Sequence, residues 1–166
     1  MNLAFTLPDT DGNPTPLHVD GARAAVVVFT CNHCPYALAW HDRLQAVARD
    51  YADRGVRFLQ INSNDAARYP RDSLEAMRER VAAGEFATPY LYDESQEVAR
   101  AWGAKTTPHV FVTDGSGIVY NGAPDADYGD PAANAEWLRA ALEDVLAGRP
   151  VAKPETKPVG CSIKWR

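Results

Sequence analysis

The sequence is poor in cysteine, with three among 166 residues, and it lacks long hydrophobic runs. Three cysteines cannot build the dense disulfide framework of small secreted domains, and a chain of this length needs none because it can bury a core of its own. The longest apolar stretch, residues 22–29, is interrupted by Arg23 and is far too short to cross a bilayer. We therefore expect a single globular domain with no membrane partner.

Positive charge is also scarce, since 17 Lys and Arg residues oppose 22 Asp and Glu residues and give a formal net charge of −5. The basic residues are scattered among acidic ones, so the phosphate-binding patch of a nucleic-acid protein is missing. Residues 1–11 lack the basic and apolar segments of a secretory signal. The sequence thus predicts a cytoplasmic protein without a nucleic-acid partner, and nothing in it demands more than a monomer.

Hydrophobic periodicity predicts strands and helices that alternate along the chain. An Asp-Gly turn at residues 11–12, between apolar runs at 3–7 and 15–19, is typical of a β-hairpin. Residues 24–30 are nearly all apolar and rich in valine, as in a buried central strand. Residues 35–55 begin with proline, repeat apolar residues at a helical period and end at glycine, which predicts an amphipathic helix.

The rest of the chain continues this alternation. Expected strands cover residues 56–61, 90–92, 109–113 and 118–120, and expected helices cover residues 72–83, 94–102 and 132–146. The order predicts an α/β fold with a central mixed β-sheet flanked by helices and an N-terminal β-hairpin extension. We expect a domain over residues 1–149 and an extended C-terminal tail, residues 150–166, packed on the same domain.

Two of the cysteines, Cys31 and Cys34, lie where an expected strand meets an expected helix. Their spacing lets the thiols close a small disulfide ring that opens and closes repeatedly. The unpaired N–H groups at a helix start favour a thiolate, so we expect Cys31 to be the nucleophile and Cys34 the resolving thiol. No separate cofactor is needed, because the redox-active disulfide carries the electrons.

The same spacing also suits a metal site, but no second C-x-x-C or H-x-x-x-H supplies the other ligands of a structural zinc site. We therefore expect no bound metal, although a copper carrier that uses Cys31, Cys34 and a distal His109 is an alternative. His33 either tunes the Cys31 thiolate or is an exposed loop residue, and Thr30 is placed with it as a tuning residue.

Beyond these motifs, residues 106–109 read Thr-Thr-Pro-His and stand just before an expected strand. Together with the Thr-Cys-Asn-His-Cys-Pro-Tyr loop of residues 30–36, they resemble the thioredoxin superfamily, and more closely the redoxin group related to AhpC/TSA enzymes. Residues 62–65 and the closing segment 156–165 are similar to that group too, so the resemblance covers nearly the whole chain.

The resemblance implies a thioredoxin-like fold in which a cis Pro108 packs beside the cysteine pair and the Thr107 backbone pairs with a bound substrate segment. A trans proline that starts a strand is the alternative. Thioredoxins place a buried Asp six residues before the first cysteine, where this chain has Ala25. Another group must then accept the proton of the resolving thiol, and Asp65 or a chain of waters is a candidate.

Four residues are possible accessories of the site. Asn62, Asn64 and Asp65 either take part in it or form a turn held by side-chain to backbone hydrogen bonds. Cys161, in the tail, either resolves an oxidised active-site cysteine or is an inert packed thiol.

The pattern favours a thiol–disulfide oxidoreductase, in which Cys31 attacks a disulfide of a protein or small molecule and Cys34 resolves the mixed disulfide. A thioredoxin or glutathione system would supply electrons. A second hypothesis is a peroxiredoxin-like thiol peroxidase with antioxidant activity, because Cys34-Pro35 resembles the end of the peroxidase loop. Against it, Cys31 replaces that loop's threonine and no arginine is recognisable beside the loop.

Overall fold

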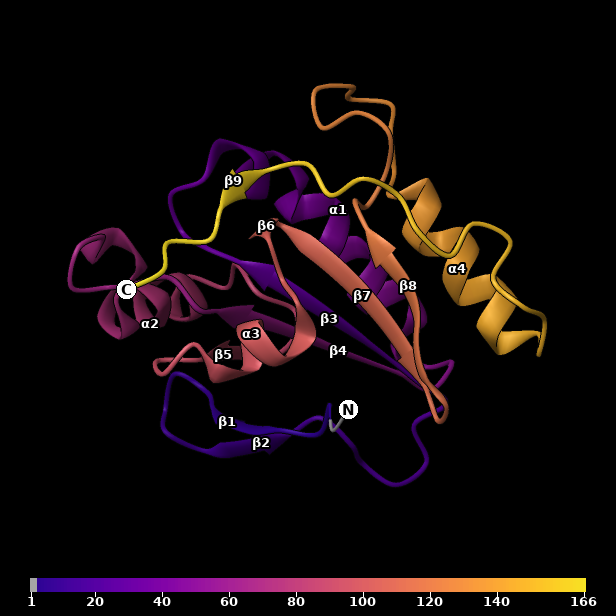
Figure 1. The fold of residues 1–166 in the computed structure, drawn as a ribbon, viewed down its shortest axis with the longest axis horizontal. Helices are drawn as coiled ribbons and strands as arrows, with labels where there is room; N and C mark the ends of the chain where they lie inside the picture. The colour runs from indigo at the N-terminus through magenta and orange to yellow at the C-terminus, as the bar shows by residue number, and fades with distance from the viewer. Residues whose placement is uncertain (1–2) are drawn as a thin grey trace.

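The computed structural model describes residues 3–166 and is built on a five-stranded sheet in the order β5-β4-β3-β7-β8. The strands are β3 (Ala24–Thr30), β4 (Val56–Asn62), β5 (Tyr90–Tyr92), β7 (His109–Asp114) and β8 (Gly117–Gly122). β3, β4 and β5 run parallel, whereas β7 is antiparallel to both β3 and β8 (Figure 1). The mixed central sheet predicted from the sequence is confirmed.

Within residues 3–166, four α-helices and one short 3-10 helix accompany the sheet. They are α1 (Pro35–Ala52), η1 (Pro70–Asp72), α2 (Leu74–Ala82), α3 (Glu97–Trp102) and α4 (Glu136–Leu146). α2 begins later than expected because Ser73 caps it, accepting a hydrogen bond from the Ala76 N–H at 3.1 Å. α4 begins at residue 136 and not 132 because Ala135 takes a left-handed φ of 55°, which no α-helix contains.

The central strand β3 is buried on both faces, which explains its almost continuous apolar sequence. Val26 and Val28 face a core formed with α1 and α4, whereas Val27 and Phe29 face a core formed with α3 and the N-terminal segment. Figure 1 shows α1 behind the sheet and α3 in front of it. The helices therefore flank the sheet as expected.

The predicted N-terminal hairpin is present, formed by β1 (Thr6–Pro8) and β2 (Pro14–Pro16). The side chain of Asp9 closes its turn by accepting hydrogen bonds from the N–H groups of Asp11 and Asn13 at 2.8 and 2.9 Å. The strands are shorter than the apolar runs suggested, because prolines end them and cannot donate to a ladder.

The C-terminal tail crosses the end of the sheet at which the carboxyl end of β3 lies. It first follows β8, where the Asn121 N–H donates to the Pro154 carbonyl at 3.1 Å. Its strand β9 (Cys161–Ser162) then pairs with β6 (Thr106–Thr107), as the yellow segment beside β6 shows in Figure 1. Within residues 3–166, no helix has the length and apolar character needed to span a membrane.

Candidate active site

The cysteine pair lies at the junction of β3 and α1. Cys31 follows the last residue of β3, and Cys34 is the N-cap of α1 with Pro35 in the first helical turn. Both thiols are reduced and buried, with 1% of Cys31 and none of Cys34 exposed. The arrangement is the one that the sequence predicted, but it is closed to solvent.

Thr107 contacts both sulfurs from across the site. The Cys31 Sγ lies 3.4 Å from the Thr107 Oγ1, and the Cys34 thiol donates to the Thr107 carbonyl at 3.1 Å. The peptide bond from Thr107 to Pro108 is cis, as the resemblance implied. One residue therefore offers a hydroxyl to the first sulfur and a carbonyl to the second.

The two thiols ionise as a unit. Hydrogen bonding between them lowers the pKa of Cys34 and raises the pKa of Cys31, which burial and the Asp72 carboxylate raise further. The pair consequently loses its first proton readily and its second with difficulty. Donors face both sulfurs, namely the Ala37 N–H at Cys34 and the His33 N–H at Cys31. Either sulfur can carry the single negative charge, so Cys31 as the nucleophile stays a prediction.

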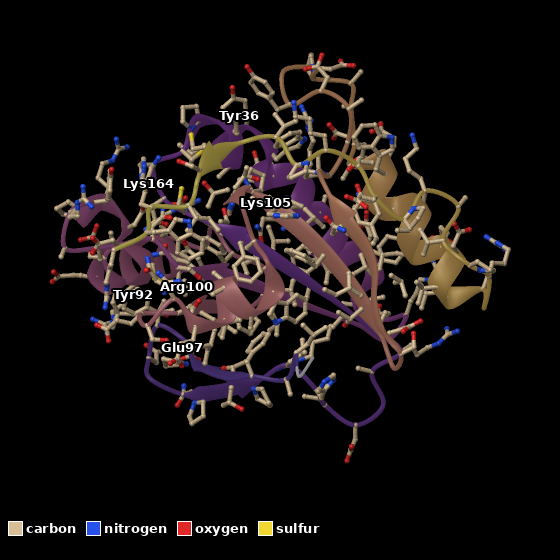
Figure 2. The ribbon with its side chains drawn as sticks, viewed as in Figure 1. Tyr36, Tyr92, Glu97, Arg100, Lys105 and Lys164 are labelled. Atoms are coloured by element: carbon tan, nitrogen blue, oxygen red, sulfur yellow. The ribbon has the colours of Figure 1, made fainter. Side chains whose placement is uncertain are left out.

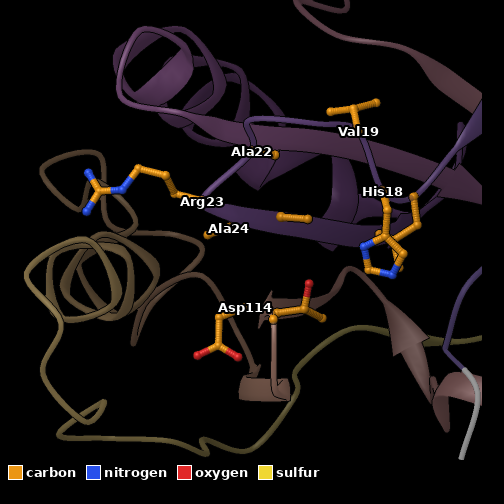
Figure 3. Close-up of a pocket in the computed structure, with 10 residues that line it drawn as sticks. His18, Val19, Ala22, Arg23, Ala24 and Asp114 are labelled. Carbon is orange, nitrogen blue, oxygen red and sulfur yellow. The ribbon is translucent and has the colours of Figure 1, made fainter.

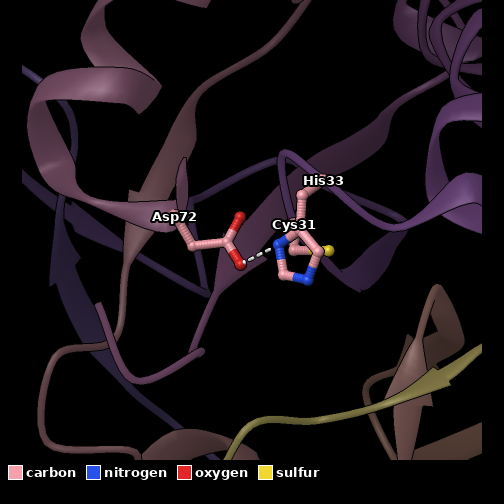
Figure 4. A group of neighbouring side chains, drawn as sticks. All are labelled: Cys31, His33 and Asp72. Carbon is pink, nitrogen blue, oxygen red and sulfur yellow. Dashed lines mark ion pairs between the residues drawn. The ribbon is translucent and has the colours of Figure 1, made fainter. Parts of the chain in front are cut away.

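His33 is anchored and is not a freely exposed loop side chain. Its Nδ1 lies 2.6 Å from the Oδ2 of Asp72, and its ring stacks on that of Tyr69 with 5.8 Å between centroids. The two atoms are at ion-pair distance, but among residues 3–166 the buried Nδ1 has no partner with hydrogen-bond geometry. Figure 4 shows the imidazole beside the carboxylate and the Cys31 sulfur, and one ligand atom from each of these three side chains lies within 4.8 Å of the others.

Asp72 is a residue of this site that the sequence analysis missed. Its fully buried carboxylate accepts from the Asn32 N–H at 2.7 Å and from the Asn64 side-chain amide at 2.9 Å, besides pairing with His33. The main-chain carbonyl of Asp72 accepts from the Asn62 amide at 2.7 Å. In the sequence Asp72 looked like the first residue of an amphipathic helix, and no local signal joins it to the cysteine loop.

The remaining predicted accessory residues divide into two groups. Asn62 and Asn64 support Asp72, and the Asn64 Oδ1 also accepts from the Lys164 N–H of the tail at 2.9 Å. The Asp65 carboxylate has other partners, since it accepts from the Ala67 N–H at 3.1 Å and lies 3.9 Å from the Arg166 Nε. Within the part of the chain that the structure describes, no hydrogen bond joins the Thr30 hydroxyl to either sulfur.

Comparison with known proteins identifies the family. The model of the AhpC/TSA family matches residues 2–121. The chain belongs to the AhpC/TSA family. Its solved relatives have the thioredoxin-like fold expected from the sequence, and the comparison with curated proteins gave no match.

Two solved relatives of this AhpC/TSA chain are similar over nearly its whole length. An uncharacterized conserved protein from Geobacillus kaustophilus shares 40% identity, over 98% of this chain and 89% of that one, with a TM-score of 0.92. A hypothetical protein from Sinorhizobium meliloti 1021 shares 39% identity, over 98% and 91%, with a TM-score of 0.90. A secreted Mycobacterium tuberculosis disulfide oxidoreductase, 20% identical over 88% and 96% with a TM-score of 0.62, shares the fold.

An arginine does lie beside the loop of this AhpC/TSA member, although the sequence gave no sign of it. Arg80, from α2, donates to the side-chain oxygen of Asn32 at 2.9 Å and approaches the carbonyl of Cys31 at 3.5 Å. The Tyr90 hydroxyl donates to the same Asn32 oxygen at 2.8 Å. The guanidinium thus holds the loop through its oxygens and not through a sulfur.

The metal site suggested with His109 is not assembled. The His109 Nδ1 accepts from the Lys105 N–H at 3.1 Å, so its Nε2 carries the proton and donates to the Asn121 Oδ1 at 3.3 Å. Both ring nitrogens are therefore engaged away from the cysteines. Among residues 3–166, the potential ligands that do gather are Cys31, His33 and Asp72, and the carboxylate already accepts two hydrogen bonds, from the Asn32 N–H and the Asn64 side-chain amide.

A pocket lies at the opposite end of β3 from the thiols. Its lining includes His18 and Arg23 before the strand and Asp114 at the end of β7 (Figure 3). The length of β3 separates it from Cys31, so it takes no part in the thiol site.

Proposed function

We propose that the protein is a thiol–disulfide oxidoreductase that cycles Cys31 and Cys34 between a dithiol and a disulfide. The observation that carries this proposal is the contact of both sulfurs with Thr107, beside the cis bond to Pro108, at the start of α1. Membership of the AhpC/TSA family supports thiol chemistry in general. Substrate and donor belong to the proposal: a disulfide-bearing protein or small molecule, and a cytoplasmic thioredoxin or glutathione system.

The reaction has two exchanges. The Cys31 thiolate attacks one sulfur of the substrate disulfide, forms a mixed disulfide and releases the other sulfur as a thiolate. Cys34 then attacks the Cys31 sulfur, which releases the second substrate thiol and leaves the Cys31–Cys34 disulfide. The substrate gains two electrons and two protons, and the pair loses them. In the mixed disulfide Cys31 no longer donates to Cys34, and the hydrogen bonds from Cys161 and the Ala37 N–H still lower the pKa of the resolving sulfur.

Insulin reduction with Cys31→Ser and Cys34→Ser variants tests the proposal. We expect both variants to lose insulin-reducing activity and Cys34→Ser to accumulate a mixed disulfide at Cys31, because nothing resolves it. Asp65→Asn is the matched control, since the Asp65 carboxylate contacts the Ala67 N–H and Arg166, and it should keep full activity. Insulin reduction that survives in both serine variants would refute the proposal.

Thiol peroxidase activity is the second candidate, favoured by the unexpected position of Arg80 beside the loop and by the lowered pKa of Cys34. It predicts that Cys34 reacts with hydrogen peroxide to give a sulfenic acid. Measuring peroxide consumption by the same two variants separates the functions. Peroxide turnover that survives Cys31→Ser and disappears in Cys34→Ser would replace the reductase proposal with the peroxidase.

A further inference from the structure

The third cysteine, Cys161, packs directly against the active-site pair. It is half-buried, it is reduced, and it joins the apolar cluster of Cys31, Cys34 and Ala37. Hydrogen bonding from Cys161 helps lower the pKa of Cys34. Three thiols therefore share one small volume, although they come from the two ends of the chain.

The tail is held at this place by contacts on both sides of Cys161. β9 and β6 pair in a register that sets Cys161 opposite Thr107. A Cβ at Gly160 would collide with the Thr107 carbonyl group, so only glycine allows this approach. On the other side Ile163 is buried, and its N–H donates to the Lys105 carbonyl at 3.2 Å. Cys161 is thus positioned by the fold.

The position of the tail beside Thr107 matches the one proposed for a bound substrate. Main chain that pairs with Thr107, beside the cis Pro108, is where the proposed function would seat a segment of substrate. In this structure the tail occupies that strand position and presents a cysteine to the pair, while Cys31 and Cys34 are closed to solvent. Figure 2 shows Tyr36 and Lys164 flanking β9 at this edge of the molecule. The tail therefore lies where the proposed function would place a segment of substrate.

We propose that Cys161 is a third redox thiol of the site, which exchanges with the Cys31–Cys34 disulfide to form a Cys34–Cys161 disulfide. The inference rests on the proposed function, because that function supplies the oxidised pair. Cys161 gives its proton to solvent and its sulfur attacks the Sγ of Cys34. The bond between Cys34 and Cys31 breaks, and Cys31 leaves as a thiolate and takes up a proton. One disulfide is present before and after, so no oxidant is consumed.

Oxidation of the pair removes one electrostatic barrier to this exchange. In the reduced protein, burial raises the pKa of Cys161 to about 11, and hydrogen bonding to Cys34 and the charge of Cys34 add to the effect. Once Cys34 is in a disulfide it carries no charge, so the repulsion disappears. The product would lock the tail across Thr107 and leave Cys31 as a free thiol.

Peptide mapping without reduction detects the exchange. The full-length protein is oxidised with diamide, quenched in acid, alkylated with N-ethylmaleimide and digested with trypsin. Residues 24–43 then carry both active-site cysteines, and residues 140–164 carry Cys161, because the basic residues at 149, 153 and 157 precede prolines. We expect these two peptides to be linked in the wild type. The link should be at least tenfold more abundant in Cys31→Ser than in Cys34→Ser.

A matched control moves the tail thiol by one residue. Cys161→Ser combined with Ser162→Cys places the sulfur on the opposite face of β9, at an exposed position opposite Thr106. We expect the cross-link to fall at least tenfold. An equal yield would refute the inference, because it would show that a mobile tail cross-links by chance.

Two other results separate the inference from the proposed function. A fully alkylated Cys161, with an intact Cys31–Cys34 disulfide inside residues 24–43 and normal insulin reduction, overturns the inference alone. Absence of the Cys31–Cys34 and Cys34–Cys161 disulfides, together with absence of insulin reduction, overturns both the inference and the proposed function.

Discussion

The Nδ1 of His33 lies 2.6 Å from the Oδ2 of Asp72, within a carboxylate network that also binds the Asn32 N–H. Asp72 thereby fixes the loop between the two cysteines from a turn far along the chain. Its negative charge also raises the pKa of Cys31. The carboxylate orders the loop and at the same time opposes ionisation of the nearby Cys31 sulfur, and the imidazole of His33 lies beside both groups.

Asp72→Asn should ease ionisation of Cys31. In a Cys34→Ser background, where Cys31 titrates alone, we expect the alkylation midpoint of Cys31 to move about one pH unit lower, because a neighbouring negative charge is removed. The protein should also lose about 1–3 kcal/mol of stability, because buried donors lose a charged acceptor. Iodoacetamide rates against pH and urea unfolding measure the two effects. Asp65→Asn should change neither midpoint nor rate, and an unmoved midpoint in Asp72→Asn would contradict this electrostatic account.

Thr107→Val should shift the alkylation midpoint of Cys31 in the opposite direction. The Thr107 hydroxyl, 3.4 Å from the Cys31 sulfur, lowers the pKa of Cys31, and valine keeps the shape of the side chain without the hydroxyl. In the same Cys34→Ser background we expect the alkylation midpoint to rise by about half to one pH unit. Thr106→Val is the control, since its hydroxyl donates to the Pro108 carbonyl at 2.8 Å and faces no sulfur. A midpoint that shifts equally in both variants would show that the effect is structural.

Gly160→Ala should open the site. The added Cβ would collide with the Thr107 carbonyl, and an overpacked contact of this kind costs about 1–3 kcal/mol, which raises an open population about 5- to 160-fold. We expect the reduced active-site thiols to react with N-ethylmaleimide faster by a similar factor. Gly115→Ala, where a Cβ meets no atom within 4 Å, should react at the wild-type rate. Unchanged reactivity of Gly160→Ala would mean that the tail does not shield the pair.

His109 should make the protein less stable in mild acid. Burial lowers the pKa of His109 from 6.5 to about 4, so between these values the unfolded state binds a proton that the folded state does not. The free energy of unfolding should therefore rise with pH through this window, by up to about 3 kcal/mol from this residue. Urea unfolding across the window should show a flatter profile for His109→Gln. An unchanged slope in His109→Gln would contradict this account.

The elements that carry the site could be predicted because their signals are local. A run of seven nearly all-apolar residues predicted the central strand Ala24–Thr30 within its observed bounds, and Pro35 marked the start of the following helix. Those two elements place Cys31 and Cys34 at one junction whatever the remaining chain does. The sequence alone thus determined the pair, its strand-to-helix setting and the sheet around it.

The tertiary structure decided what surrounds the sulfurs. Asp72, Arg80 and Cys161 reach the cysteine loop from a 3-10 turn, a helix and the C-terminal tail, and no periodicity or spacing encodes those meetings. Burial, the charge of Asp72 and the hydrogen bonds from Thr107 set the ionisation of the pair, and each depends on distances between segments far apart in the chain. Local pattern fixes where the thiols stand, whereas packing fixes their charge, their access to solvent and the third sulfur beside them.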